Sequence, residues 1–167
     1  HIVFAENSGW NPESILTKLK HSPTVEIEYI SLNADEYDIK KGKSYNEMLL
    51  INQATERSET IKDAGCFFKL TGRYPIKNLY DLLSEVERYS KKHMGGYNLY
   101  CDCKDHKVYE WLHMPINGHA GECRYYAVSM DFYNKYFRNS YVELDDSKGK
   151  NVEMLFLDVI RKTRHME

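Results

Sequence analysis

CFFKLTGRY, residues 66–74, is the stretch of this sequence that decides the fold. Its first five residues form a short apolar run between helical patterns, which is typical of a central strand. Two cations and a glycine at the end of such a strand are hard to explain by packing alone. Glycine lets the backbone approach a ligand closely, and arginine can grip phosphate oxygens in a fork. We interpret Lys69, Gly72 and Arg73 as an anion site, with a turn whose cations pair with surface carboxylates as the alternative.

Strand and helix patterns alternate on both sides of this stretch. A proline after Asn11 predicts a helix there, and the spacing of Ser44 and Glu47 predicts a capping box at the start of another. We further expect strands at 2–4, 25–29, 97–101, 107–111 and 123–128, and helices at 79–86, 132–137 and 152–160. Such alternation predicts an α/β fold, a mainly parallel sheet with helices on both faces, in one domain spanning residues 1–167.

The length, composition and net charge of the chain limit the classes of function that it can have. With 167 residues, 42% of them hydrophobic and 29% charged, the chain is an ordinary globular domain. Its net charge of -2 argues against nucleic-acid binding, which usually leaves a basic footprint. We see no signal peptide and no stretch of about 20 apolar residues that would cross a membrane. Cys101 and Cys103 lack the second pair of a zinc site, so we expect reduced cysteines and a cytoplasmic protein.

In sheets of this kind, ligands bind outside the carboxyl ends of the strands. Glu6, Asn7 and Gly9 follow the first predicted strand and could hydrogen-bond a ribose or a base, although an ordinary turn explains them equally well. Asp102 follows a later strand, three residues before Asp105. These carboxylates could hold a divalent ion beside a diphosphate, or they could belong to a charged hairpin.

Glu153 lies in the first turn of the last predicted helix. The helix dipole favours an acid at this position, so Glu153 needs no function there. A carboxylate in this place could equally act as the general base for an attacking hydroxyl. We count Glu153 and Asp102 as the candidate catalytic residues.

Several of these segments together resemble bacterial glycosyltransferases of capsule and lipopolysaccharide synthesis. The core of the resemblance is Lys69-Leu70-Thr71-Gly72-Arg73-Tyr74, which is moderately specific, whereas the other pieces are weak when taken singly. Those pieces are the residues 2–9, 42–48, 100–102, 132–137 and 149–153. The resemblance therefore spans nearly the whole chain.

This resemblance implies a fold like that of the A-type, Rossmann-like glycosyltransferases. Glu6 and Asn7 would face the nucleoside of a nucleotide-sugar donor. Lys69 and Arg73 would stand where many relatives carry an Asp-x-Asp metal motif and would neutralise the departing diphosphate. Glu153 would match the base of inverting relatives, and Arg124 would assist at the phosphates.

The implied function is transfer of a sugar from a nucleotide-sugar to a glycan or lipid-linked acceptor in bacterial surface polysaccharide synthesis. No cofactor is required by this interpretation, and a divalent metal, manganese or magnesium, is allowed but not favoured. We expect no nucleic-acid partner, a cytoplasmic location that can include the inner face of the membrane, and peripheral membrane association through other components.

Two alternatives stay open. A full domain of this type begins with another strand and helix, and this chain starts at His1, so we expect a fragment or a trimmed variant lacking that first unit. A non-catalytic domain that binds a nucleotide or sugar would suit such a start. A metal-dependent nucleotidyltransferase or phosphatase is the other alternative, and it predicts a carboxylate cluster to which only Asp102 and Asp105 could contribute.

Overall fold

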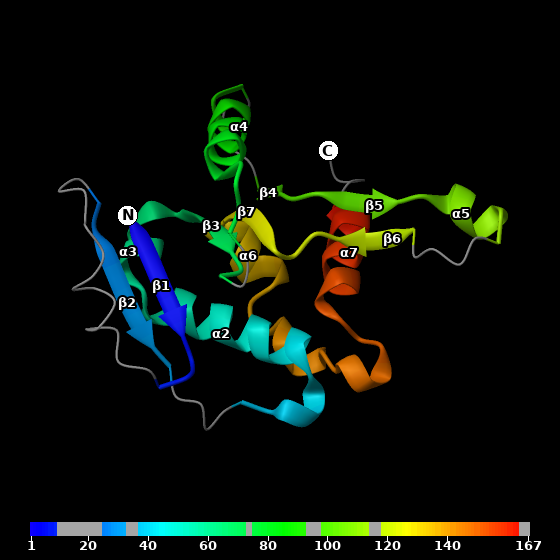
Figure 1. Cartoon of the computed structure of the whole chain (residues 1–167), viewed down its shortest axis with the longest axis horizontal. Helices are drawn as coiled ribbons and strands as arrows, with labels where there is room; N and C mark the ends of the chain where they lie inside the picture. The colour runs from blue at the N-terminus through cyan, green and yellow to red at the C-terminus, as the bar shows by residue number, and fades with distance from the viewer. Residues whose placement is uncertain (10–24, 33–36, 73–74, 93–97, 114–117, 164–167) are drawn as a thin grey trace.

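The computed structural model describes residues 1–9, 25–32, 37–72, 75–92, 98–113 and 118–163 (Figure 1). Its strands are β1 (Ile2–Glu6), β2 (Ile27–Ser31), β3 (Cys66–Leu70), β4 (Leu99–Tyr100), β5 (Cys103–Asp105), β6 (His119–Gly121) and β7 (Tyr125–Ser129). Its α-helices are α2 (Lys43–Arg57), α3 (Glu59–Ala64), α4 (Leu79–Lys92), α5 (Lys107–Trp111), α6 (Met130–Tyr136) and α7 (Val152–Thr163). Three short 3₁₀ helices are η2 (Ile39–Lys41), η3 (Ser140–Glu143) and η4 (Asp146–Lys148).

Within the described residues the strands form three small sheets, and the β1–β2 pair is the only parallel one among them. β1 and β2 pair in parallel, from Ile2 opposite Ile27 to Glu6 opposite Ser31. β3, β7 and β4 form an antiparallel sheet with β7 in the middle, and β5 pairs antiparallel with β6. The predicted mainly parallel, Rossmann-like sheet is therefore wrong.

The burial of β3 gives the physical reason for this correction. Strands of parallel sheets are usually buried on both faces, because helices cover both. In β3, however, Cys66 and Leu70 are exposed, and the three residues between them are only half-buried. Such a strand suits an antiparallel partner, and Lys69 lies opposite Tyr126 of β7. An alternation of elements along the chain does not fix the direction in which two strands pair.

Several predicted elements are nevertheless confirmed. The strand at Cys66–Leu70 is β3, and the helices predicted at 132–137 and 152–160 correspond to α6 and α7. The strand predicted at residues 107–111 is wrong, because this segment is the helix α5. The helix predicted from Asn11 lies outside the described residues.

The predicted capping box of α2 is also wrong. The helix begins at Lys43 after the N-cap residue Gly42. The backbone N–H groups of Lys43 and Ser44 donate to the carboxylate of Asp146, at 2.7 and 3.2 Å. A carboxylate satisfies the unpaired amides at a helix start and suits the helix dipole. The helix is thus capped by a residue more than one hundred positions away in the sequence, and Glu47 is left for another partner.

The hydrophobic core lies between α2, α6, α7 and one face of the β3–β7–β4 sheet. Its most buried large side chains are Tyr126, Tyr133, Phe137 and Phe156. Figure 1 shows α4 at the other end of this sheet from α2. A ring contact between Tyr89 and Tyr100, with 6.1 Å between the ring centroids, joins α4 to β4.

The hairpin of β5 and β6, with α5 between them, projects from the body of the molecule as an arm, whose described residues are 103–113 and 118–121 (Figure 1). The base of the arm packs on α7. A Cβ atom added at Gly121 would lie 2.5 Å from the Cβ atom of Phe156, so the two elements approach as closely as a glycine allows. Among the described residues, no helix combines the length and the apolar character needed to cross a bilayer.

Candidate functional site

Three of the candidate side chains from the sequence, those of Lys69, Asp102 and Arg124, contact or belong to Gly121–Tyr125, the segment that leads from β6 into β7, and the backbone of Glu153 lies beside it. Arg124 belongs to this segment. Asp102 is joined to it twice, because its carbonyl oxygen accepts from the N–H of Glu122 at 2.7 Å and its carboxylate accepts from the hydroxyl of Tyr125 at 3.1 Å. The contacts of Lys69 and Glu153 with the same segment are described next.

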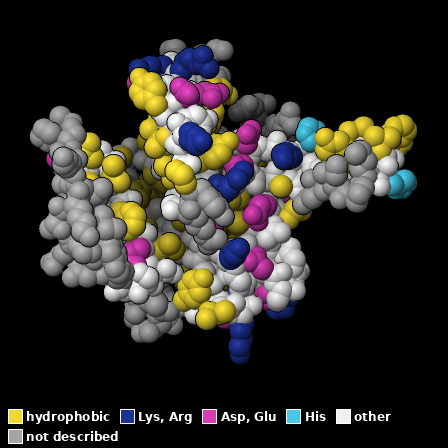
Figure 2. All heavy atoms as spheres, in the orientation of Figure 1, with side chains coloured by type: hydrophobic (Ala, Val, Ile, Leu, Met, Phe, Trp, Pro, Cys, Tyr) yellow, Lys and Arg dark blue, Asp and Glu magenta, His cyan; other side chains and the backbone are white. Residues whose placement is uncertain are grey.

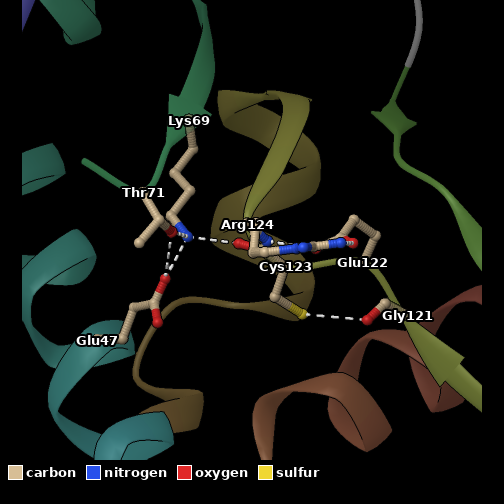
Figure 3. Close-up of polar contacts among 7 residues, drawn as sticks. All are labelled: Glu47, Lys69, Thr71, Gly121, Glu122, Cys123 and Arg124. Atoms are coloured by element: carbon tan, nitrogen blue, oxygen red, sulfur yellow. Dashed lines mark hydrogen bonds and ion pairs between the residues drawn. The ribbon is translucent and has the colours of Figure 1, made fainter. Parts of the chain in front are cut away.

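Lys69 reaches the segment from β3 (Figure 3). Its ammonium donates to the carboxylate of Glu47 and to the carbonyl oxygen of Cys123, and it lies 2.7 Å from the hydroxyl of Thr71. That hydroxyl is also 3.1 Å from the Glu47 carboxylate. The side chains of Lys69 and Glu47 are only 10% and 24% exposed. An ammonium has three protons to donate, and these three acceptors use all of them.

Glu153 lies in the first turn of α7, as the sequence predicts. Burial raises the pKa of the Cys123 thiol, and the negative charge of Glu153 raises it further. The carbonyl oxygen of Glu153 would lie 3.3 Å from a Cβ atom at Gly121. The Glu153 side chain itself is exposed, so its carboxylate is accessible to solvent beside this segment.

Arg124 lies at the surface with its guanidinium on Glu122 (Figure 3). The Arg124 Nε atom is 2.9 Å from Glu122 Oε1, and Nη2 is 2.5 Å from Oε2. These hydrogen bonds lower the pKa of Glu122. Because the Arg124 side chain is 74% exposed and Glu122 only 19%, the guanidinium still presents most of its surface to solvent. An arginine in this position can bind an anion if it releases or shares Glu122.

Glu6, Asn7 and Gly9 lie at the end of the parallel β1–β2 pair, in a different sheet from Lys69. One Glu6 oxygen accepts from the hydroxyls of Tyr29, at 2.7 Å, and Ser31, at 2.9 Å. The other accepts from the backbone and the hydroxyl of Ser8. Desolvation alone would raise the pKa of Glu6, but these hydrogen bonds outweigh it and lower the pKa to about 2. The carboxylate thus ties the two strand ends together.

Asp102 and Asp105 do not share a site. Asp105 accepts from Arg161 of α7 at 2.7 Å and lies 2.8 Å from the ring of His119, so it belongs to the base of the arm. Among the residues that the structure describes, no group of three or more His, Cys, Asp or Glu side chains is arranged to hold a metal ion. Burial raises the pKa of the Cys101 thiol to about 12.

The remaining nominated residues are Gly72 and Arg73. A Cβ atom added at Gly72 would have no described atom within 4 Å, so the backbone there borders open space. Arg73 lies outside the described residues. The roles assigned to both of them from the sequence stay predictions.

Sequence reasoning missed two functional candidates here, Glu47 and Glu122. Glu47 lies in the run Gly42–Met48 that contributed to the resemblance, but its spacing from Ser44 favoured a cap. Glu122 stands two positions before Arg124, and side chains two apart on an extended segment point the same way. The two-residue spacing of Glu122 and Arg124 could therefore have been used to predict their ion pair.

No family model, curated protein or solved structure matches this chain. The functional interpretation therefore depends on its sequence motifs and on the geometry of the described residues.

Proposed function

We propose that the chain is a glycosyltransferase that takes a nucleotide-sugar donor and passes the sugar to a glycan or lipid-linked acceptor. The observation that supports this proposal is the meeting of four distant parts of the chain at Gly121–Tyr125: Lys69 and Asp102 contact this segment, Arg124 belongs to it, and the backbone carbonyl of Glu153 lies beside Gly121. A site for glycosyl transfer needs cations for the leaving diphosphate and a carboxylate for the acceptor.

The reaction assigns one task to each charge. The acceptor hydroxyl attacks the anomeric carbon of the donor and forms the new carbon–oxygen bond, while the bond from that carbon to the diphosphate breaks. The acceptor proton passes to the carboxylate of Glu153. Negative charge develops on the departing diphosphate, where the exposed guanidinium of Arg124 and the side chain of Arg73 would stabilise it.

Lys69 has a narrower role in this scheme than its sequence position implied. All three donor positions of its ammonium are occupied, so a phosphate must displace one acceptor before Lys69 can bind it. Direct contact between Lys69 and the diphosphate stays a prediction. In the described state Lys69 orients the Glu47 carboxylate and holds the end of β3 against Cys123.

The occupied ammonium also favours a second candidate function. A domain that binds a nucleotide-sugar without converting it does not need an available cation to stabilise a departing diphosphate. Both candidates predict binding of a nucleotide-sugar, and only the first predicts that the donor is consumed.

Donor breakdown tests the proposal. The purified chain is incubated with nucleotide-sugars of each common base, with and without a chelator, and free nucleoside diphosphate is measured. A transferase of this kind releases it slowly even without an acceptor and continues in chelator. Binding without release would support the non-catalytic domain, and release that chelator abolishes would support a metal-dependent phosphate-handling enzyme.

A further inference from the structure

The helix α5 at the end of the arm has one apolar face that the described residues leave open. Val108 and Trp111 of α5, with Leu112 directly after it, follow the i, i+3, i+4 spacing that places side chains on one face of a helix, and the N–H of Leu112 donates to the carbonyl oxygen of Val108 at 3.0 Å. Their exposed fractions are 49%, 78% and 52%. Figure 2 shows the hydrophobic side chains of the arm gathered along its outer edge.

The other face of the same helix packs inward. The ring of Tyr109 lies 5.3 Å from that of His106, and a Cβ atom added at Gly118 would lie 2.9 Å from the Tyr109 ring. The side of α5 that carries Tyr109 therefore packs within the arm.

The arm is firmly attached to the body. Asp105 of β5 accepts two hydrogen bonds from Arg161 of α7, at 2.7 and 3.3 Å, and pairs with His119 of β6. Gly121 allows the end of β6 to lie directly on Phe156. These contacts hold the base of the arm on α7, and Figure 1 shows α5 at the far end of the arm, away from the core.

The part of the face that the described residues form is too small to favour a second copy of the chain as its occupant. A stable protein interface buries about 800 Å² on each partner. Even a fully buried tryptophan contributes only about 150–250 Å², so three partly exposed side chains fall well short. Binding to a lipid surface instead scales with the apolar area inserted plus the electrostatic attraction to anionic lipids, so a small apolar face can contribute together with nearby lysines.

The chemistry of the face favours a lipid surface. Tryptophan is enriched at the boundary between lipid headgroups and acyl chains, because its ring is apolar and its N–H is polar. Lys104 of β5 and Lys107, the first residue of α5, are exposed on the same arm. The acids of this part of the arm are Glu110 and Asp105, and Asp105 is already neutralised by Arg161. The lysines can therefore approach anionic headgroups.

We propose that the outer face of the arm, Val108, Trp111 and Leu112, docks the protein directly on the surface of an anionic phospholipid bilayer. The apolar side chains enter the headgroup boundary, and Lys104 and Lys107 contact the lipid phosphates. This inference does not depend on the proposed glycosyl transfer.

Vesicle binding tests it on the whole chain. The protein is sedimented with vesicles of phosphatidylglycerol and phosphatidylcholine in equal parts, and with vesicles of phosphatidylcholine alone. We expect binding to the anionic vesicles, at least about tenfold weaker for Trp111→Ala and about fivefold weaker for each of Lys104→Ala and Lys107→Ala. The matched control is Tyr80→Ala, which removes an aromatic side chain of 81% exposure from α4 and should bind as the parent does.

A fluorescence measurement keeps the test independent of these truncations. The chain has two tryptophans, Trp10 and Trp111, so Trp10→Phe leaves Trp111 as the only indole. Its emission should shift to shorter wavelength when anionic vesicles are added. Absence of parent binding, equal binding of Trp111→Ala, or an unshifted Trp111 in sedimenting protein would each overturn the proposal. A shift that depends on protein concentration without vesicles would also overturn it, in favour of a second copy.

Discussion

The ammonium of Lys69 is ion-paired with the carboxylate of Glu47, 22 residues earlier in the chain, and both side chains are largely shielded from solvent. The pair joins the end of β3 to α2, and the hydroxyl of Thr71 bridges the two charges. Lys69, which the sequence predicted to bind a ligand, thus forms contacts within the protein that join two of its elements. Any role of Lys69 in binding must be compatible with this structural one.

Removing one member of this pair should destabilise the fold. We expect Lys69→Met to lower the free energy of unfolding by about 2 kcal/mol, because Glu47 is left as a poorly solvated, uncompensated charge. The double variant Lys69→Met with Glu47→Gln should recover part of this loss. Urea denaturation measures both. The control is Lys62→Met, which removes an exposed pair with Glu59 and should cost less than about 1 kcal/mol. An equal loss of unfolding free energy in Lys69→Met and Lys62→Met would contradict a structural role for the Lys69–Glu47 pair.

Gly42 should tolerate no side chain, for two reasons. Its φ of +88° disfavours L-residues, and an added Cβ would lie 2.7 Å from the Cβ atom of Asp146, the residue that caps α2. Gly65 has a φ of +67° with nothing within 4 Å, so it isolates the backbone effect. We expect Gly65→Ala to cost about 1 kcal/mol and Gly42→Ala about 2 kcal/mol more. Similar melting temperatures for the two variants would show that the contact with Asp146 is not tight.

Glu6 should make stability depend on acid pH. Its pKa is about 2 in the folded chain against 4.5 for an unperturbed glutamate, so its contribution is complete above about pH 4.5 and is lost as the pH falls toward 2. We expect Glu6→Gln to cost on the order of 1 kcal/mol at about pH 6 and almost nothing at about pH 2. Denaturation at both pH values measures this. The same cost at both would mean that the ionised carboxylate does not hold the β1–β2 ends together.

Glu153 should affect turnover without affecting donor binding. A side chain that accepts the proton of the acceptor hydroxyl contributes at least about 100-fold to the rate, so Glu153→Gln should slow transfer by that factor and leave the donor dissociation constant unchanged. Glu143→Gln, at an exposed acid of the 3₁₀ helix η3, is the control. A nearly normal rate for Glu153→Gln would leave Glu153 with a helix-dipole role only.

Local patterns were sufficient to predict some of these elements. Cys66–Leu70 is a strand because an apolar run ends at a glycine turn, and α7 follows from its apolar stripe. The five residues Lys107–Trp111 are too few to distinguish the two-residue period of a strand from the 3.6-residue period of a helix. Extending the window by one residue to Leu112 reveals the helical spacing of Val108, Trp111 and Leu112.

Long-range contacts could not be predicted in the same way. The cap that Asp146 provides for α2 joins residues more than one hundred positions apart, and no spacing rule points to it. The Ser44–Glu47 spacing was misleading, because Glu47 has a more favourable partner in the ammonium of Lys69. The direction of β3 likewise depends on β7, which lies more than fifty residues later. The gathering of nominated residues around Gly121–Tyr125 is also a long-range property.

A thermal-shift screen against nucleoside diphosphates and their sugar conjugates, with and without manganese, tests the central claim most directly. At a hundredfold excess over its dissociation constant, a ligand that binds only the folded chain should raise the melting temperature by about 5–10 °C. We predict such a rise for one family of nucleotide-sugars, and a rise much reduced in Arg73→Ala and Arg124→Ala. Arg138→Ala, which removes a surface pair with Glu56, should keep it. No rise with any nucleotide, or an equal rise in the Arg73 and Arg124 variants, would contradict a donor site at this end of β3.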